Sequence, residues 1–446
     1  MLPAPVLKLV QTFGWTTLSI LFLVYWSQGF RQFGTVAITY FFKDELGLDP
    51  GSAQYIRSLS FVAWYIKPIY GMVSDNCPIC GLYRKPYLFL AGTMGTISLI
   101  SFLWLKGEAT VVIVLTLFEL SEAIADVLAD ALMVQEARKD PESGSSLLQS
   151  FCWFVLALGG LVGGPLGGLA LEYFSAKHVI AMQAFAPLLL VLTSFIFIEY
   201  RTETVQTDSI RQRCTSLWTL TKSPKILRPC LFIYLSSATV PGLSQTFTYF
   251  YTDELQFSAT FVSILLCIGY IAICIGSVLY TWKLRTLKLR TVISAGQLLM
   301  ALSSVFELML VTKANRFMGI PDAGLALFAD SVSSAISFTC KSMPIFVLSS
   351  NICPQGVEAT LFALIASVGN LGFFSSEFLG GVMVDLFGVR QGEYGNFWAV
   401  IFLRGLLRLS PLLYIRLVPD DTGEATALVA AEAGKEWELS AHINQV

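Results

Sequence analysis

Charge and histidine are the scarcest features of this 446-residue chain. Charged residues occupy 13% of its positions, about half of the share found in soluble domains, and only two histidines occur. A chain so poor in charge is not an ordinary soluble globular protein. The net charge of −2 and the lack of a basic tract give no sign of nucleic-acid binding.

Motifs for catalysis, metal binding and ATP-driven work are missing as well. The sequence contains no HExxH, GxSxG or Walker pattern, which argues against a zinc or serine hydrolase and against an ATP-driven pump. The nine cysteines are scattered, and the Cys77-Pro-Ile-Cys80 pair has no second pair or nearby histidine to complete a zinc site. We therefore expect no enzyme activity, cofactor, metal or disulfide framework.

Long apolar stretches are what the sequence has in abundance. Apolar residues make up 55% of the chain, and stretches long enough to cross a bilayer as helices alternate with turn or charge clusters. These stretches fall at about 14–42, 53–74, 86–105, 109–134, 147–172, 178–200, 229–252, 259–281, 291–312, 323–350, 358–384 and 396–416. The sequence thus predicts an all-α membrane protein with twelve transmembrane helices.

The twelve stretches form two groups of six. We expect an N-terminal bundle in 1–200, a cytoplasmic linker in 201–228, a C-terminal bundle in 229–418 and a disordered acidic tail in 419–446. With the N-terminus in the cytoplasm, the inner segments hold sixteen Lys and Arg residues and the outer loops six, which fits the positive-inside rule. Both termini are therefore expected in the cytoplasm, or on the stromal or matrix side of an organelle, and the choice of membrane stays open.

Two short patterns recur in the second half of the chain. "YFFKDELGL" at 40–48 is similar to "YFYTDELQF" at 249–257, with an offset of 209 residues. "GGLALEYF" at 167–174 is similar to "GGVMVDLF" at 380–387, with an offset of 213. Two bundles in the same orientation are typical of the major facilitator fold, whose halves are related by an axis normal to the membrane.

Four carboxylates interrupt the fourth apolar stretch. Glu119, Glu122, Asp126 and Asp130 are spaced by three, four and four residues, so they share one face of a helix. Each charge costs roughly 2.5–3.5 kcal/mol at the bilayer centre on insertion scales. We expect this face to line a hydrated central pathway and to bind substrate or protons, and the alternative is an internal salt bridge.

Further polar residues lie inside other predicted spans. They could pair with the acidic residues or bind substrate, and the sequence leaves both uses open for Arg31 and Arg404. Lys67 stands beside Pro68, where pairing or snorkelling to the membrane surface is an alternative to a functional role. The candidates for substrate binding or proton coupling besides the four carboxylates are Gln28, Arg31, Lys67, Asp330, Lys341 and Arg404.

The loop after the second span contains a candidate cytoplasmic gate. It reads "GMVSDNCPICGLYRKPY", in which Gly71, Asp75, Arg84 and Lys85 are similar to the Gly, Asp and paired basic residues of the major facilitator signature. Asn76 stands where a basic residue is usual, and the interval between Asp75 and the next glycine is longer. A structural role in fixing topology is the alternative.

Several motifs together resemble the folate-biopterin transporter family of the major facilitator superfamily. They include "FFKDELGLDP", "ADVLADALMVQEAR" and "CPQGVEATLFALIASVGNLG", and the resemblance covers roughly residues 35–415. It implies a monomeric secondary transporter of folates or pterins that works by alternating access in the lipid bilayer and is coupled to protons. A carrier of another small organic anion and a transport-inactive receptor remain alternatives, because related carriers change cargo on one frame.

The chemistry of a folate suits the polar residues of the predicted spans. Its carboxylates call for Arg or Lys, and the amino group and ring N–H of its pterin present a donor pair that suits a carboxylate such as Asp126. Asp130 and Glu122 could alternatively take up a proton, since burial and neighbouring negative charge both favour the neutral form of a carboxyl group.

Overall fold

The computed structural model describes residues 4–137, 139–140, 144–197, 199, 222–284, 287–345, 348 and 358–420. The predicted linker at 201–228 lies outside this part up to residue 221, and so does the predicted tail from 421 onward. The side chains of two candidates, Asp75 and Asp330, also lie outside it, although the backbone of their helices is described.

The described part is helical, apart from two isolated β-bridges in loops. The helices of the first half are α1 (Ala4–Phe30), α2 (Gln32–Tyr40), η1 (Phe41–Glu45), α3 (Pro50–Ser60), α4 (Val62–Tyr65), α5 (Lys67–Asn76), α6 (Lys85–Ser101), η2 (Phe102–Trp104), α7 (Glu108–Ala137), α8 (Gly144–Tyr173), α9 (Ala176–Met182) and α10 (Phe185–Ile196). Those of the second half are α12 (Pro224–Ala238), α13 (Ser244–Tyr249), η3 (Phe250–Glu254), α14 (Ala259–Trp282), α15 (Leu289–Val311), α16 (Ala314–Phe317), α17 (Asp322–Ser337), η5 (Phe338–Ser342), α19 (Glu358–Leu386), α20 (Phe397–Leu407) and η6 (Ser410–Leu417).

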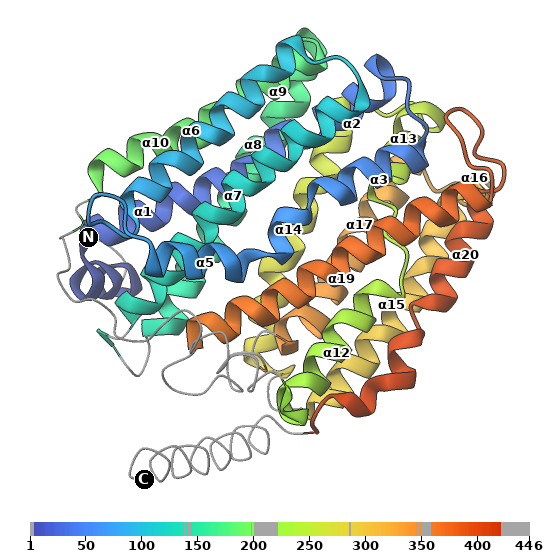
Figure 1. Ribbon diagram of the computed structural model, residues 1–446. Coiled ribbons are helices and arrows are strands. Elements are labelled where there is room, and N and C mark those ends of the chain that lie inside the picture. Colours follow the sequence, from blue (N-terminus) through green and yellow to red (C-terminus); the bar gives the residue numbers. More distant parts are fainter. Residues whose placement is uncertain are drawn as a thin grey trace.

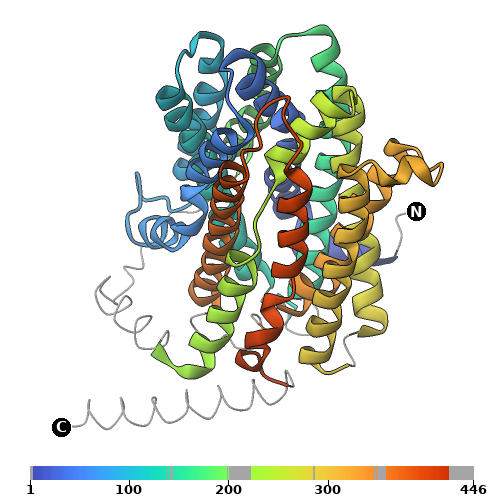
Figure 2. The same cartoon turned by 90° about the vertical axis from the view of Figure 1, so that its right-hand side faces the viewer.

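The two halves of the chain lie beside each other (Figure 1). Turning the molecule by 90° shows helices of the second half, coloured from lime to red, running next to one another along its length (Figure 2). The most extensive helix contacts between the halves are those of α8 with α14 and of α3 with α19. We call the end of the molecule that carries η1 and η3 the outer end, because the charge distribution predicts that it faces away from the cytoplasm.

Six described segments are long and apolar enough to cross a membrane. They are Leu9–Glu45, Lys85–Trp104, Phe151–Tyr173, Ala176–Ile196, Leu289–Val311 and Phe397–Leu417. The acidic helix α7 is not among them, because every stretch of it long enough to span holds three or more acidic residues. Large apolar side chains such as Ile97, Phe195 and Leu302 point outward from these segments, as a lipid-facing surface requires. The helical membrane fold is thus confirmed, and the count of twelve spans stays a prediction.

Two predicted spans are broken rather than continuous. The stretch predicted at 53–74 consists of α3, α4 and α5, with Pro68 in the first turn of α5. Proline has no N–H to donate, and it disfavours the helical conformation in the residue before it. The stretch predicted at 229–252 breaks between α12 and α13, where Pro241 and Gly242 stand.

The two copies of the first repeated pattern have the same local backbone structure. The two copies of the first pattern form matching single turns of π-helix, η1 and η3, which begin at Phe41 and Phe250. Each turn is followed by a residue with positive φ, Gly47 at 64° and Gln256 at 56°. All of these pairs are 209 residues apart, so the backbone follows the same path at the end of the first span of each half.

The second repeated pattern supplies glycines at matching helix contacts. A Cβ on Gly167 would lie 1.9 Å from the carbonyl oxygen of Phe33, and one on Gly380 would lie 1.6 Å from that of Gly242. Phe33 and Gly242 are themselves 209 residues apart, so the same contact is made once in each half. Only glycine allows such close approach of two helix backbones.

The next glycine of each pattern faces the opposite half. A Cβ on Gly168 would lie 2.6 Å from the hydroxyl of Ser263 on α14, and one on Gly381 would lie 2.5 Å from the ring of Tyr55 on α3. The interface between the halves therefore includes two glycine contacts related by the repeat.

Candidate functional site

The four carboxylates of α7 lie on one face of the helix, and we call them the acidic ladder. Their environment changes steadily along the helix. The side chain of Glu119 is 0% exposed and Glu122 is also buried, whereas Asp126 is 12% and Asp130 is 32% exposed. Asp130 lies nearest the end of α7 that is predicted to face the cytoplasm. The exposed fraction of the side chains thus increases along the ladder from Glu119 to Asp130.

Glu119 is held by three donors from the first half. The guanidinium groups of Arg31 and Arg57 approach its two oxygens at 2.8 and 2.7 Å. The indole N–H of Trp64 donates to it at 2.7 Å. Sequence analysis left open whether Arg31 binds an anion or serves as a structural partner, and here it is paired inside the protein. It gave no role to Arg57.

Asp126 and Asp130 share a lysine. The ammonium group of Lys67 forms an ion pair with Asp126, and its distance to an oxygen of Asp130 is 3.9 Å. Asp126 also accepts a hydrogen bond of 3.0 Å from Gln28, and Asp130 accepts one of 2.8 Å from the hydroxyl of Tyr25. Lys67, Asp126 and Gln28 therefore come together as predicted candidates, in the arrangement of an internal salt bridge.

Trp64 lies between two of these cations. The guanidinium carbon of Arg31 is 5.5 Å from the centre of its ring and the ammonium nitrogen of Lys67 is 5.3 Å from it, distances at which a cation is attracted to an aromatic face. The backbone carbonyl of Trp64 accepts a hydrogen bond of 3.0 Å from Asn370 of α19. This residue thus links the ladder to the second half.

Glu122 differs from the other three acids. Both of its carboxyl oxygens are buried, and neither has a hydrogen-bond partner among the described residues. The charged groups that act on it are Arg31, Glu119 and Asp126, and the first of these is already paired with Glu119. A buried carboxylate without a partner is costly, and such a group adopts its neutral form instead.

The second half contains a separate ion cluster, which includes one predicted candidate. Glu307 of α15 accepts hydrogen bonds from Arg404 at 3.2 Å and from Arg408 at 2.8 Å. Arg408 also donates to the hydroxyl of Ser304. Arg404 was a predicted candidate and its partner Glu307 was not, although a single acid in the apolar run "SSVFELML" was a usable signal.

Lys341 lies in η5, apart from this cluster. Its ammonium group donates to the backbone carbonyl of Ser236 at 2.8 Å and to the hydroxyl of Ser237 at 3.1 Å, both on α12. The structure therefore does not bring Lys341 into an ion pair with the described acids.

Three residues of the predicted gate, Gly71, Arg84 and Lys85, have described contacts within the first half. A Cβ on Gly71 would be 3.5 Å from Val127 of α7. The carboxylate of Glu199 accepts the backbone N–H groups of Tyr83, Arg84 and Lys85 at 2.8–3.1 Å. It thereby satisfies the first donors of α6, as an acidic cap does.

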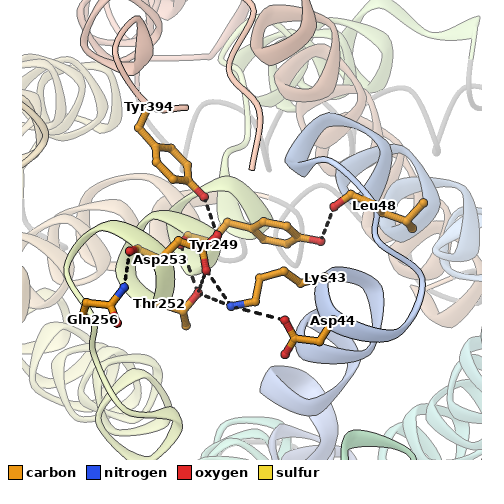
Figure 3. A network of polar contacts seen from close by, with 8 residues as sticks. All are labelled: Lys43, Asp44, Leu48, Tyr249, Thr252, Asp253, Gln256 and Tyr394. Carbon is orange, nitrogen blue, oxygen red and sulfur yellow. Dashed lines mark hydrogen bonds and ion pairs between the residues drawn. The ribbon is translucent and has the colours of Figure 1, made fainter. Parts of the chain in front are cut away.

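The two copies of the first repeated pattern meet at the outer end (Figure 3). Lys43 donates to Asp253 at 2.7 Å and to Thr252 at 3.0 Å, and the hydroxyl of Tyr394 donates to the other oxygen of Asp253 at 3.0 Å. We call Lys43, Thr252, Asp253 and Tyr394 the outer latch. The two patterns revealed the repeat in the sequence, but they did not predict a role for Lys43 or Asp253.

A second layer of contacts between the halves lies next to the outer latch. Glu377 of α19 accepts hydrogen bonds from Gln54 of α3 and, at 2.8 Å, from Ser244. The side-chain amide oxygen Oε1 of Gln54 accepts the backbone N–H of Gln245 at 3.1 Å, and Thr39 donates to the side chain of Gln245 at 2.8 Å. The outer end is thus closed by two layers of polar contacts.

Comparison with known proteins shows to which family the chain belongs. The family model described as the BT1 family matches residues 28–433. The chain belongs to the BT1 family. A folate-biopterin transporter of Synechocystis sp. is 34% identical over 407 residues, covering 91% of this chain and 82% of that protein. A probable folate-biopterin transporter of Arabidopsis thaliana is 32% identical over 396 residues, covering 86% of this chain and 79% of that protein.

Solved structures resemble this BT1-family chain in fold. A nucleoside transporter superposes with a TM-score of 0.71 at 13% identity, covering 91% of this chain and all of that one. A D-xylose–proton symporter superposes with a TM-score of 0.66 at 16% identity, covering 94% and 99%. At these identities the likeness shows the fold alone, which is the predicted major facilitator fold. The chain is a multi-pass membrane protein of a transporter family rather than an enzyme.

Proposed function

We propose that this protein is a proton-coupled secondary transporter of folates or pterins that works by alternating access. The observation that carries the proposal is the acidic ladder of α7, whose exposed fraction rises from 0% at Glu119 to 32% at Asp130. Carboxylates inside a membrane span line a pathway or relay protons in most proteins that contain them. The names of the relatives supply the substrate class.

Asp130 is the ladder carboxylate best placed to receive the pterin. It is the most exposed of the four. Its carboxylate accepts a hydrogen bond from the neutral hydroxyl of Tyr25, and the ammonium group of Lys67 is 3.9 Å away. A carboxylate can accept both donors of the pterin edge at once, and such charge-assisted pairs are roughly twice as strong as neutral ones. Asp126, by contrast, already accepts from Gln28 and Lys67, so its role is to hold the lysine in position.

Glu122 is the proton site in this proposal, because it is buried and lacks a partner among the described residues. Glu122→Gln mimics the protonated form permanently. We expect the variant to fold and to transport substrate, but to lose the acceleration that an acid-outside pH gradient gives the unaltered protein. The measurement is substrate uptake into liposomes with and without the gradient.

Glu136→Gln is the matched control for Glu122→Gln. Glu136 lies on the same helix and is paired with Lys139 and Thr17 near the end predicted to be cytoplasmic. It should keep the full response to the gradient. An unchanged response in the Glu122 variant would remove this residue from the proton pathway.

Alternating access requires the outer latch to open during each cycle. Asp253→Asn removes the charge that Lys43 and Tyr394 share, and a hydrogen bond to a charged group contributes about 1.5–3 kcal/mol. We therefore expect the outer end to open about tenfold more often. A cysteine at Thr248, which is 8% exposed, would then react faster with a membrane-impermeant maleimide in a background without the other cysteines.

Asp44→Asn is the control, since Asp44 is the repeat counterpart of Asp253. Its carboxylate is 3.8 Å from Lys43 and 53% exposed, so its loss should hardly change the labelling rate. Equal rates for both variants would argue that the latch does not control opening.

Reconstituted uptake tests the proposal as a whole. Purified protein in liposomes should accumulate labelled folic acid or biopterin, with competition by the unlabelled compounds and with a dependence on the pH gradient. Uptake of another organic anion without competition by either compound would favour a different cargo. Failure to transport any tested anion, although folic acid binds, would favour a receptor. The same preparation can report the monomeric state and, by protease protection, the cytoplasmic position of both termini that we propose.

A further inference from the structure

We propose that Lys341 binds the glutamate carboxylates of the substrate and thereby determines the preference for folates over pterins that lack such a tail. The inference rests on the proposed function and assigns the second half of the molecule its part in recognition. The observation that carries it is a cation, Lys341, whose described partners are neutral and which lies in the predicted span of the second half that corresponds to the span of Asp130.

Lys341 is a cation inside a predicted span whose described partners are all neutral. Its ammonium group has three N–H donors, and two of them reach the oxygens of Ser236 and Ser237. One donor and the full positive charge remain available to a ligand. A charge at such a depth usually pairs with an opposite charge or lines a water-filled path.

The other described cations of the polar clusters are each paired with an acid. Arg31 and Arg57 share Glu119, Lys67 pairs with Asp126, Arg404 and Arg408 share Glu307, and Lys43 pairs with Asp253. Among these residues Lys341 alone is bonded only to neutral oxygens.

Asp330 of α17 is too distant to neutralise Lys341. The two residues are eleven positions apart on one helical segment. With a rise of 1.5 Å per residue they are separated by about 16 Å along the axis, which exceeds the combined reach of both side chains. None of the described acids pairs with Lys341 either, and in this proposal an anionic substrate supplies the negative charge.

The repeat places Lys341 in the span that corresponds to the acidic ladder. The two repeated patterns have offsets of 209 and 213 residues, and Lys341 follows Asp130 by 211. Lys341 is therefore within two residues of the position that corresponds to Asp130 in the fourth predicted span of the second half. A folate has complementary ends, a pterin that donates two hydrogen bonds and a tail that carries negative charge, and it can bridge the two groups.

Neutralising Lys341 distinguishes recognition of the glutamate tail from recognition of the pterin ring. We expect Lys341→Gln to raise the KM for folic acid about ten- to a hundredfold, the range for a lost charge-assisted bond, and to change the KM for biopterin less than about twofold. Lys341→Arg should recover part of the folic acid affinity. Asp130→Asn is the matched control from the other half, and it should weaken transport of both compounds because both contain the pterin ring.

A second measurement needs no variant and remains informative if Lys341→Gln does not fold. The unaltered protein should be inhibited much more weakly by the diamide of folic acid, in which both glutamate carboxylates are neutral, than by folic acid itself. Equal inhibition, or an equal loss of folic acid and biopterin transport in Lys341→Gln, would overturn the role of Lys341 and leave the transporter function standing. Absence of uptake of either compound by the unaltered protein would overturn the transporter function itself.

Discussion

Glu119→Gln should destabilise the protein severely. Glu119 is 0% exposed, and its two oxygens are paired with Arg31 at 2.8 Å and Arg57 at 2.7 Å. The glutamine leaves two guanidinium groups close together without a compensating charge. Breaking a buried pair by removing one partner costs about 3–5 kcal/mol. We expect a lower midpoint of thermal unfolding in detergent, measured by gel filtration of heated samples, and a smaller yield of folded protein.

The control for this prediction lies on the same helix. Glu108→Gln changes an acid in the exposed first turn of α7 and should leave the unfolding midpoint nearly unchanged. If the two variants melted at the same temperature, the ion pairs of Glu119 would have no role in stability.

Asp126→Asn should abolish most transport. Asp126 is the close partner of Lys67, and its loss leaves the lysine free to move the short distance to Asp130, which is 3.9 Å away. The carboxylate that we assign to the pterin would then be occupied by a cation. We expect the uptake rate to fall about a hundredfold, which corresponds to ~2.7 kcal/mol, for folic acid and biopterin alike at equal amounts of folded protein.

A double variant distinguishes a structural role of Asp126 from a functional one. Asp126→Asn combined with Lys67→Gln removes both charges, so that no cation is left to occupy Asp130. If Asp126 acts through Lys67, as we argue, the double variant should regain a substantial part of the lost uptake. An inactive double variant would mean that Asp126 itself binds substrate or proton, and normal uptake by the single variant would contradict both roles.

The sequence predicted the faces of the helices well and their partners poorly. The spacing of Glu119, Glu122, Asp126 and Asp130 places them on one face whatever surrounds the helix, because the helical period is fixed. Which residue meets which acid depends on the rotation and depth of neighbouring helices. For this reason Arg57 was not foreseen as a partner of Glu119, although its distance from it in the structure is 2.7 Å.

The repeat was predicted from the sequence, whereas the breaks within two spans were not. Two short patterns were enough to predict parallel halves, and the matched π-helical turns at Phe41 and Phe250 agree with them. The breaks of the second and seventh spans were not predicted, because mean hydropathy over a stretch is insensitive to a local change of backbone direction. Pro68 and the Pro241-Gly242 pair were the available signals.

The loop at 77–85 shows a contact that the sequence did not predict. The paired basic residues suggested a gate, which stays a prediction, and their backbone N–H groups are bound by Glu199. No periodicity argument could have found this contact, since the residues are more than a hundred positions apart and belong to the ends of two helices.

The outer latch has a consequence for the ancestry of the molecule. Lys43 and Thr252 are counterparts in the two repeats, yet the ammonium group of one lies 3.0 Å from the hydroxyl of the other, so the latch straddles the symmetry axis itself. A primordial protein with two identical copies would have had like facing like there, ammonium against ammonium or hydroxyl against hydroxyl. The hydrogen bond between Lys43 and Thr252 therefore depends on a difference between the two copies at this position, whereas the ion pair of Lys43 with Asp253 does not.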